Sequence, residues 1–491
     1  MSTEQQHGVV FPQGTDGRRS TAAVGRSVVA DALRGVDAAG ARAAEQETNW
    51  RAGYLGHFRR LLEAGLGSRE DAVRIARDGL TSLHQTMVVR SGDADVPLDD
   101  WAGATTPGTL GTAVVTGESE PETELSLPLH GHRLRGEALR AQLRTWVTAG
   151  VVEPSVATAV ETVMDHPDWL HLEGHTVAVL GAGAEMGPLT ALLRWGARVA
   201  AVDLPRQAVW ERVLELGRHG AGTLLLPTRG GGGAADPGAA GADLLAEVPS
   251  IAAWLDEVGV EDRLVLGNYV YADGAANVRV SMAVDALSVR LLEARPDAAL
   301  AFLATPTDVF AVPGEAVRHA TRAYDDRSST ARLVGRPLRT LSAGRLLRRS
   351  YLADADPGVN DSLVPQQGPN YALAKRLQRW RAVQARDTGT LVSMNVAPPT
   401  RTRSVVKNRA LAAAYAGAHR FGVEVFEPAT SNVLMAALLV HDLHTDGGPA
   451  TEHPWQDEAH AAAHGGLWRT AYAPRSALGL AALLGYGAAR G

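Results

Sequence analysis

A glycine-rich segment in the middle of the chain has the residue types of a phosphate-binding turn. Gly181, Gly183 and Gly187 follow a short apolar run that predicts a buried strand, and a helical pattern follows them. Glycines at such a turn let the backbone approach a phosphate, and the free N–H groups of a helix N-terminus favour an anion. Asp203, 22 residues beyond Gly181, ends the next predicted strand, where a carboxylate accepts hydrogen bonds from ribose hydroxyls. The sequence therefore predicts a Rossmann-type site for a nucleotide cofactor.

Two cofactor classes use this arrangement. One is the nicotinamide dinucleotides, and the other is S-adenosylmethionine, which methyltransferases bind at a similar glycine loop and acid. The residues around Gly181 and Asp203 suit either class. A tight strand-to-helix turn that binds nothing is the remaining alternative.

A tyrosine and a lysine further along the chain could move a proton. Tyr371 and Lys375 are four residues apart in a helical pattern, which places both side chains on one face of the helix. An ammonium beside a phenol favours the phenolate, so we expect the pKa of Tyr371 to be lowered toward neutral pH. The alternative is a surface helix on which the two residues are incidental.

The elements that must position these residues alternate between strand and helix, which predicts an α/β fold. We expect a doubly wound parallel Rossmann sheet at residues 173–445, with an arginine-rich insertion at 313–367. The predicted strands cover 177–180, 197–202, 223–227, 263–266, 298–304 and 390–396. The predicted helices that follow them cover 187–195, 206–218, 251–258, 275–293, 371–384 and 404–419.

The flanking parts of the chain differ from this alternation. Residues 1–172 are predicted to form a tail and a helical accessory domain, and residues 446–491 a small helical cap. We expect a flexible tail at 1–26, a long loop at 91–128 and a disordered surface loop at 230–241, because these segments are polar or rich in glycine and proline.

The order of these motifs resembles the short-chain dehydrogenase/reductase family. In that family a Tyr-x-x-x-Lys helix leads to a strand that ends in an Asn-x-x-Ala-Pro-Gly-like loop, and Asn395-Val-Ala-Pro398 is similar, although it is one residue shorter and Pro399 replaces the glycine. The glycine loop matches the family pattern in length, with Leu180 in place of a threonine and Glu185 in place of the middle glycine. The resemblance covers about 265 of the 491 residues.

The resemblance implies roles for particular residues. Tyr371 would be the general acid/base, and Lys375 would bind the nicotinamide ribose. Thr305 or Thr307 would supply the hydroxyl that polarises the substrate carbonyl, with Ser362 as a rival. Ser281, with Asn277 nearby, would stand for the asparagine of the proton relay. The residues expected at the cofactor are Gly181, Ala182, Gly183, Glu185, Met186, Gly187, Asp203, Leu204, Asn268, Lys375 and Pro398.

The expected cofactor is NAD, because Asp203 would repel the 2′-phosphate of NADP. Arg206 could pair with that phosphate, so NADP remains possible. The expected function is NAD(P)-dependent hydride transfer between nicotinamide and a small carbonyl or alcohol substrate. The alternatives are an S-adenosylmethionine-dependent methyltransferase and a nucleotide-binding protein with a degenerate catalytic site.

Composition excludes several other classes. The chain has no cysteine, which excludes disulfides, thiolate metal sites and a cysteine nucleophile. The formal charge of −6 gives no reason to expect nucleic acid as a partner. No signal peptide or membrane-length apolar run is present, so we expect a cytoplasmic protein without a membrane partner. The histidines show no zinc-site pattern, so no metal is expected.

The arginines of 318–349 are expected to be a solvated face or an oligomer contact, with a polyanionic substrate as the alternative. The helices at 275–293 and 371–384 commonly form subunit contacts in the resembled family, so a homodimer or homotetramer is plausible.

Overall fold

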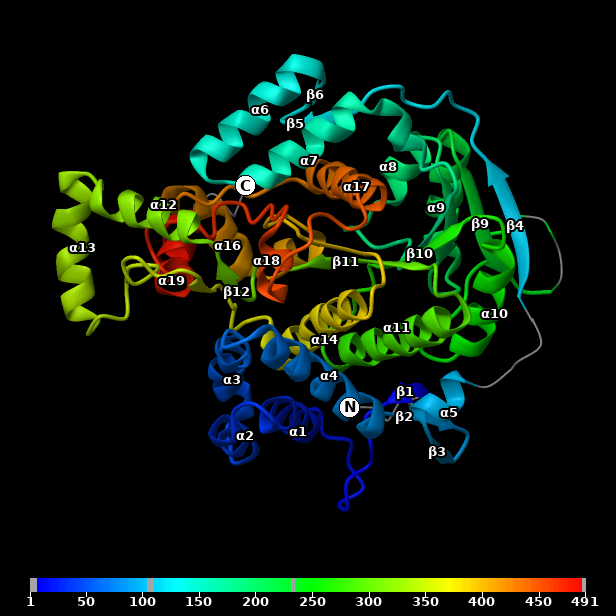
Figure 1. The fold of residues 1–491 in the computed structure, drawn as a ribbon, viewed down its shortest axis with the longest axis horizontal. Coiled ribbons are helices and arrows are strands. Elements are labelled where there is room, and N and C mark those ends of the chain that lie inside the picture. Colours follow the sequence, from blue (N-terminus) through cyan, green and yellow to red (C-terminus); the bar gives the residue numbers. More distant parts are fainter. Residues whose placement is uncertain (1–6, 104–109, 231–232, 234, 488–491) are drawn as a thin grey trace.

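The computed structural model describes residues 7–103, 110–230, 233 and 235–487. A seven-stranded sheet forms its centre, with the strand order β14-β11-β10-β7-β8-β9-β4 (Figure 1). Its members are β7 (His175–Leu180), β8 (Arg198–Val202), β9 (Thr223–Thr228), β10 (Arg263–Asn268), β11 (Ala299–Ala304), β14 (Val392–Val396) and β4 (Gly111–Thr116). All neighbours are parallel except β4, which is antiparallel to β9. In chain order the parallel strands follow the 3-2-1-4-5-6 arrangement of a Rossmann sheet.

Helices cover both faces of the sheet (Figure 1). One face carries α10 (Val248–Val258), α11 (Ala275–Ala294) and α14 (Gly368–Asp387), and the other carries α8 (Leu189–Arg194), α9 (Gln207–His219) and α17 (Pro428–His444). Strand side chains alternate between the two resulting cores: Ala178 and Leu180 lie in the first, Val177 and Val179 in the second. Because both faces are buried, the strands consist almost entirely of apolar residues.

The N-terminal segment packs on the first of these faces. Its helices are α1 (Thr21–Arg34), α2 (Ala38–Glu45), α3 (Trp50–Gly65), α4 (Arg69–Thr86) and α5 (Leu98–Ala102), and its small sheet consists of β1 (Gly8–Val10), β2 (Val88–Ser91) and β3 (Ala94–Pro97). Helix α4 lies along α14, and the side chains of both belong to one continuous core. At Gly79 the backbone of α4 approaches so closely that an added Cβ would be 2.5 Å from the ring of Trp380.

The remaining elements lie around the second face and the end of the sheet. A hairpin and two helices lie between β4 and β7 in the chain: β5 (Leu127–Leu129), β6 (His132–Leu134), α6 (Gly136–Ala149) and α7 (Pro154–Asp165), followed by the short η1 (Pro167–His171). After β14 come α15 (Arg403–Lys407), α16 (Arg409–Gly417), η2 (Ala418–Phe421), and, beyond α17, α18 (Pro454–Ala459) and α19 (Pro474–Gly485).

The arginine-rich insertion forms a projecting arm. Its helices are α12 (Gly314–Asp325) and α13 (Ser329–Leu341), and α13 lies at the outer end (Figure 1). Two short strands, β12 (Val309–Val312) and β13 (Gly358–Asp361), pair antiparallel at its base. This pairing brings the two ends of the insertion together. Thr305 and Tyr371 are therefore far apart in sequence, but the elements that carry them remain close in space.

Three expectations about the flanking segments are wrong. Residues 8–11 are not a free tail, because Val9, Val10 and Phe11 are buried and β1 pairs with β2. The predicted loop 91–128 contains β4, whose alternating apolar residues complete the sheet edge. Within 230–241, residues 231, 232 and 234 lie outside the described part, whereas Ala240 is buried and bridges to Thr228. The sheet therefore draws one strand from within residues 1–172.

Candidate active site

The carboxyl ends of adjacent parallel strands meet at one edge of the sheet, and the candidate residues lie along it. From β7 the chain proceeds to β8 and β9 on one side, whereas β10, β11 and β14 follow on the other side. The reversal falls between β7 and β10, and ligands of such sheets bind in the crevice at that point. Leu180 and Asn268 end these two strands as register partners, so the glycine loop begins directly beside Asn268.

The first two loop glycines are required by the fold itself. Gly181 has φ +86°, and an added Cβ would lie 3.0 Å from the carbonyl oxygen of Tyr269. A Cβ at Gly183 would come within 2.6 Å of Val209. Gly187 differs, because its Cβ would meet nothing closer than 3.7 Å. Close packing therefore does not require a glycine at position 187, where an added Cβ would only be in ordinary contact with the Tyr269 side chain.

Asp203 faces the glycine loop from the end of β8. Its Oδ2 accepts the Gly183 N–H at 2.7 Å and its Oδ1 accepts the Leu204 N–H at 2.7 Å. Each oxygen keeps a further lone pair that a ribose hydroxyl could use. Arg212 donates to the carbonyl oxygen of Gly183 at 2.8 Å, which places a second cation, besides the exposed Arg206, near this end of the loop. The charges here do not discriminate between NAD and NADP.

The second half of the loop is bound by other parts of the chain. Asn432 of α17 accepts the Gly187 N–H at 3.2 Å and donates to the carbonyl oxygen of Glu185 at 2.8 Å. The Glu185 carboxylate accepts the backbone N–H of Arg403 at 2.7 Å. Helix α8 begins at Leu189, two residues later than predicted, and has only six residues. Its N-terminus therefore contributes less to anion binding than the sequence suggested.

Tyr371 and Thr305 come together beyond the end of β11. Burial raises the pKa of the Tyr371 phenol, while the nearby Thr305 hydroxyl acts in the opposite direction and Asp308 adds to the rise. The Thr305 and Thr307 hydroxyls are hydrogen-bonded to each other at 2.9 Å. The expected lowering of the Tyr371 pKa by Lys375 is not observed, because burial dominates. The hydroxyls of Tyr371, Thr305 and Thr307 nevertheless lie near one another at this edge of the sheet.

Lys375 lies in a partly buried position without a carboxylate partner. Its Nζ donates to Gln378 Oε1 at 3.0 Å and to the carbonyl oxygen of Leu303 at 3.3 Å. The amide of Gln378 donates in turn to Asn268 Oδ1 at 3.3 Å, which links the lysine to the crevice between β7 and β10. Burial lowers the pKa of Lys375 to about 8. The lysine can therefore exist in either protonation state near neutral pH.

Buried ion pairs fix the helix that carries Tyr371 and Lys375. Arg379 donates to Asp308 at 2.7 Å and to both oxygens of Glu458 at 2.6 Å, and Arg376 donates to Asp308 at 2.8 Å. Burial disfavours the charge on Asp308, but the two arginines hold its pKa below the ordinary value. Sequence reasoning missed these positioning residues, because their acidic partners lie about seventy to eighty residues away in the sequence.

The other candidates are placed as follows. Ser281 and Asn277 are buried in α11, and the Ser281 hydroxyl and the Asn277 Nδ2 have no hydrogen-bond partner among the described residues. Ser362 donates to Asn360 and lines the same cavity as Thr307. Pro398 accepts a hydrogen bond from the Thr400 hydroxyl at 2.9 Å. Ala182 and Met186 pack into the second core.

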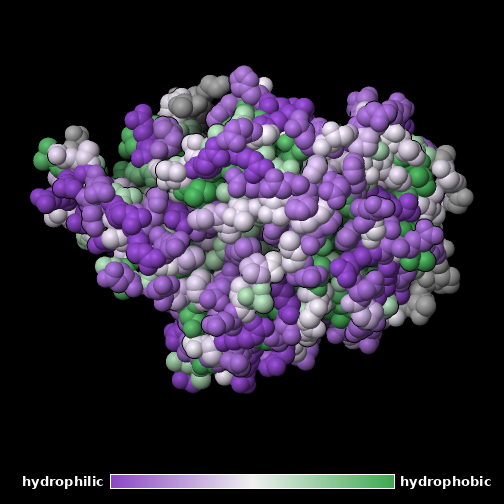
Figure 2. All heavy atoms as spheres, turned by 45° about the horizontal axis from the view of Figure 1, so that its top comes forward, coloured by the Kyte–Doolittle hydropathy of each residue, from purple (hydrophilic) through white to green (hydrophobic). Residues whose placement is uncertain are grey.

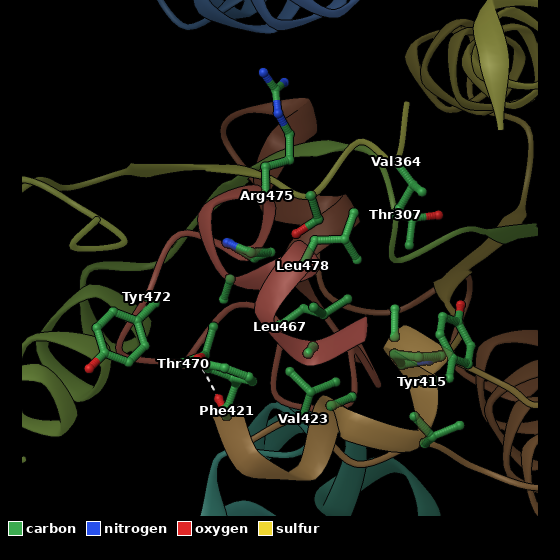
Figure 3. A pocket seen from close by; sticks show the side chains of 18 of the residues that line it. Thr307, Val364, Tyr415, Phe421, Val423, Leu467, Thr470, Tyr472, Arg475 and Leu478 are labelled. Atoms are coloured by element: carbon green, nitrogen blue, oxygen red, sulfur yellow. Dashed lines mark hydrogen bonds between the residues drawn. The ribbon is translucent and has the colours of Figure 1, made fainter. Parts of the chain in front are cut away.

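An apolar cavity of about 80 Å³ adjoins the hydroxyl cluster. Thr307 and Tyr415 lie at one end and Tyr472 at the other (Figure 3). The side chains between them come mainly from α16, α19 and the segment that precedes α14: Leu363, Val364, Ala414, Phe421, Val423, Leu467 and Leu478. The lining beside Thr307 is mostly apolar, with Arg475, which pairs with Asp361, at its margin, and such a space suits a hydrophobic organic group.

Comparisons with known proteins give distant likenesses only. No family model and no curated protein matches the chain. A solved structure of a short-chain dehydrogenase/reductase from Burkholderia xenovorans matches with 16% identity and a TM-score of 0.34, covering 60% of this chain and 97% of its own. An oxidoreductase of that family from Burkholderia thailandensis matches with 14% identity and a TM-score of 0.31, covering 60% and 92%. An A-type ketoreductase from a modular polyketide synthase gives 15% and 0.31, covering 55% and 46%.

Likeness at this level fixes no function, so the roles of the residues depend on the contacts described above. Within the described ranges, no group of three His, Asp or Glu side chains could hold a metal ion. None of the helices described is long and apolar enough to cross a membrane.

Proposed function

We propose that the chain is a nicotinamide-dependent oxidoreductase that acts on a carbonyl/alcohol pair. The observation that carries this proposal is the position of Tyr371 near Thr305 beyond the end of β11, with Lys375 on the same helix and hydrogen-bonded to the Leu303 carbonyl oxygen of β11. Lysine is rare in this chain: only two of its 48 basic residues are lysines. A lysine at this position, in a chain that otherwise uses arginine, supports a role that needs a side chain able to release its proton, because a buried arginine stays charged.

The chain's own groups would handle the proton and the substrate. The bound nicotinamide would supply or accept the hydride. The Tyr371 hydroxyl would donate a proton to the carbonyl oxygen of a ketone or accept one from an alcohol, and Thr305 would hold the same oxygen by a second hydrogen bond. A positive charge on Lys375 would stabilise the phenolate that remains after donation. The apolar cavity beside Thr307 would receive the hydrophobic part of the substrate and exclude water.

The dinucleotide would lie across the crevice between β7 and β10. Asp203 would accept from the adenosine ribose, the open side of Gly187 would face the diphosphate, and Asn268, with Lys375, would be near the nicotinamide ribose. The absence of any contact closer than 3.7 Å to a Cβ built at Gly187 is compatible with this placement. The contact of Asn432 with the Gly187 N–H would have to open when the diphosphate binds.

Replacement of Tyr371 by phenylalanine tests the mechanism directly. Tyr371→Phe removes one hydroxyl and little volume, so folding and nucleotide affinity should persist while turnover falls by about 10²- to 10⁴-fold. The assay is hydride transfer, followed at the nicotinamide absorbance with a panel of hydrophobic ketones and alcohols. Tyr486→Phe, at the exposed end of α19, is the control for loss of a tyrosine hydroxyl. Equal turnover in wild type and Tyr371→Phe would remove Tyr371 from the reaction.

A second candidate is a binding protein with a degenerate site, and the contacts of Asn432 and Glu185 favour it. Asn432 accepts the Gly187 N–H, a donor that a diphosphate would otherwise use. Glu185 places a carboxylate where the diphosphate would lie. Calorimetric titration of wild type with NAD, NADP and S-adenosylmethionine distinguishes the candidates. Binding of NAD or NADP together with hydride transfer supports the oxidoreductase, binding of either without turnover of the ketone and alcohol panel supports the degenerate site, and exclusive binding of S-adenosylmethionine supports a methyltransferase.

A further inference from the structure

The projecting arm contains a hollow that is separate from the candidate active site. Its volume is about 340 Å³. The lining residues come from the end of α12, from α13 and from the segment after α13: Tyr324, Asp325, Arg327, Arg332, Gly335, Arg336, Arg339 and Leu347. Hydrophilic side chains cover much of this arm, which projects at the left of Figure 2. Four guanidinium groups thus surround one small polar space.

The positive charge of this hollow is not neutralised by the described part of the chain. Asp325 is the one acidic residue of the lining, and its carboxylate is paired at 3.2 Å with Arg349, which does not line the hollow. The arginines of the lining contact neutral oxygens instead. Arg327 donates to the Tyr472 hydroxyl at 3.3 Å and lies 3.3 Å from the centre of the Tyr324 ring. No carboxylate of the described residues lies within ion-pair distance of these four guanidinium groups.

Three of the four arginines form a stripe on α13. Arg332, Arg336 and Arg339 are four and three residues apart, so they follow one another on one helix face over about 10 Å. Like charges at this spacing destabilise a helix by a few tenths of a kcal/mol per pair. All three side chains are exposed and no apolar packing on α13 requires them. The arrangement is unfavourable in isolation and becomes favourable when an anion binds between the guanidinium groups.

We propose that this hollow binds the diphosphate or triphosphate group of a small organic ligand. Guanidinium groups bind phosphate oxygens in pairs, and a stripe about 10 Å long can hold two or three linked phosphates where a single phosphate reaches only part of it. The site is concave and is built from one arm of one chain, which suits a compact ligand. It also adjoins the apolar cavity, because Tyr472 lines that cavity and contacts both Tyr324 and Arg327.

Inorganic pyrophosphate and triphosphate are the probes that test this site. Both should bind the full chain in calorimetric titrations, more tightly than inorganic phosphate and less tightly as salt is raised. Arg336→Gln should weaken pyrophosphate binding at least about tenfold, since hydrogen bonds to charged groups are worth about 1.5–3 kcal/mol. Arg336→Lys keeps the charge but cannot form paired hydrogen bonds with phosphate oxygens. Its pyrophosphate affinity should therefore lie between that of wild type and that of Arg336→Gln. No hydrogen bond or ion pair of the described chain depends on the Arg336 side chain, so these variants should fold.

The control is Arg144→Gln on α6, which removes the same charge from an exposed position away from the arm. Equal pyrophosphate affinity in Arg336→Gln and Arg144→Gln would overturn the proposal, as would absence of pyrophosphate binding by wild type. A single-stranded RNA that binds wild type more tightly than triphosphate and loses this binding in Arg336→Gln would also overturn it, in favour of a nucleic-acid contact. Turnover plays no part in this test, so its outcome is independent of the proposed oxidoreductase activity.

Discussion

Replacement of Lys375 by methionine should stabilise the folded protein at neutral pH while removing activity. Burial lowers the pKa of Lys375 from 10.5 to about 8, which means that the folded state disfavours the charged form. At about 1.36 kcal/mol per pKa unit, this corresponds to about 3 kcal/mol of destabilisation when the lysine is charged in both states. Methionine fills a similar volume without charge.

The hydrogen bonds of the lysine offset part of this gain. Its Nζ donates to Gln378 and to the Leu303 carbonyl, and loss of these donors costs about 1 kcal/mol. We therefore expect Lys375→Met to raise the free energy of unfolding by about 2 kcal/mol at pH 7. Below pH 8, Lys375 is charged in both the folded and the unfolded protein, and the full destabilisation is present. Between pH 8 and 10.5 the lysine is neutral in the folded protein and loses its proton progressively in the unfolded chain, so the destabilisation disappears. The difference between variant and wild type should shrink over that interval.

Urea denaturation at several pH values between 7 and 10.5 measures this difference, with nucleotide absent. Lys407→Met is the matched control, because Lys407 is the chain's other lysine and is exposed. A variant that is less stable than wild type at pH 7, or a difference that does not change with pH, would refute the reasoning. A gain in stability with loss of turnover would show that Lys375 is retained for function at a cost to the fold.

Two further substitutions test how the site is supported. Burial alone would raise the pKa of Glu153, but hydrogen bonds from Arg469 and His464 lower it to about 2. The ionised carboxylate therefore stabilises the fold above pH 4.5. This contribution is lost as the pH falls from 4.5 toward 2. Glu153→Gln should therefore cost about 3 kcal/mol at pH 7 and less in acid, as acid-dependent urea midpoints would show; a constant difference would contradict this. Gly79→Ala should lower the melting temperature through contact with Trp380, whereas alanine at Gly56, which has open space, should not.

The sheet was predictable because its strands are continuous apolar runs that end at turns. Five predicted helices between or after the strands also recur in the structure with small shifts of their ends, and the glycine loop and Asp203 lie at the predicted edge. Strand β4 was missed although its Val and Thr residues favour a strand, because it lies within a longer segment rich in glycine, proline and polar residues and its partner β9 lies more than a hundred residues later.

The site was only partly predictable for a similar reason. Spacing on a helix places Tyr371 and Lys375 together, but the meeting of Thr305 with Tyr371 depends on the pairing of β12 with β13 across the insertion. The pKa of Tyr371 depends on burial, which the local sequence does not show. The same holds for Asn432, whose contact with the glycine loop joins residues 245 positions apart.

The packing of α4 along α14 has a consequence for how the molecule behaves on dilution. The helix that carries Tyr371 and Lys375 is covered by a helix of the same chain, with Gly79 against Trp380. A face that a separate subunit covers becomes exposed when the protein is diluted, because dissociation is bimolecular. A tethered helix is present at a fixed effective concentration instead. The geometry of α14, and the turnover per molecule that depends on it, should therefore be the same at every protein concentration.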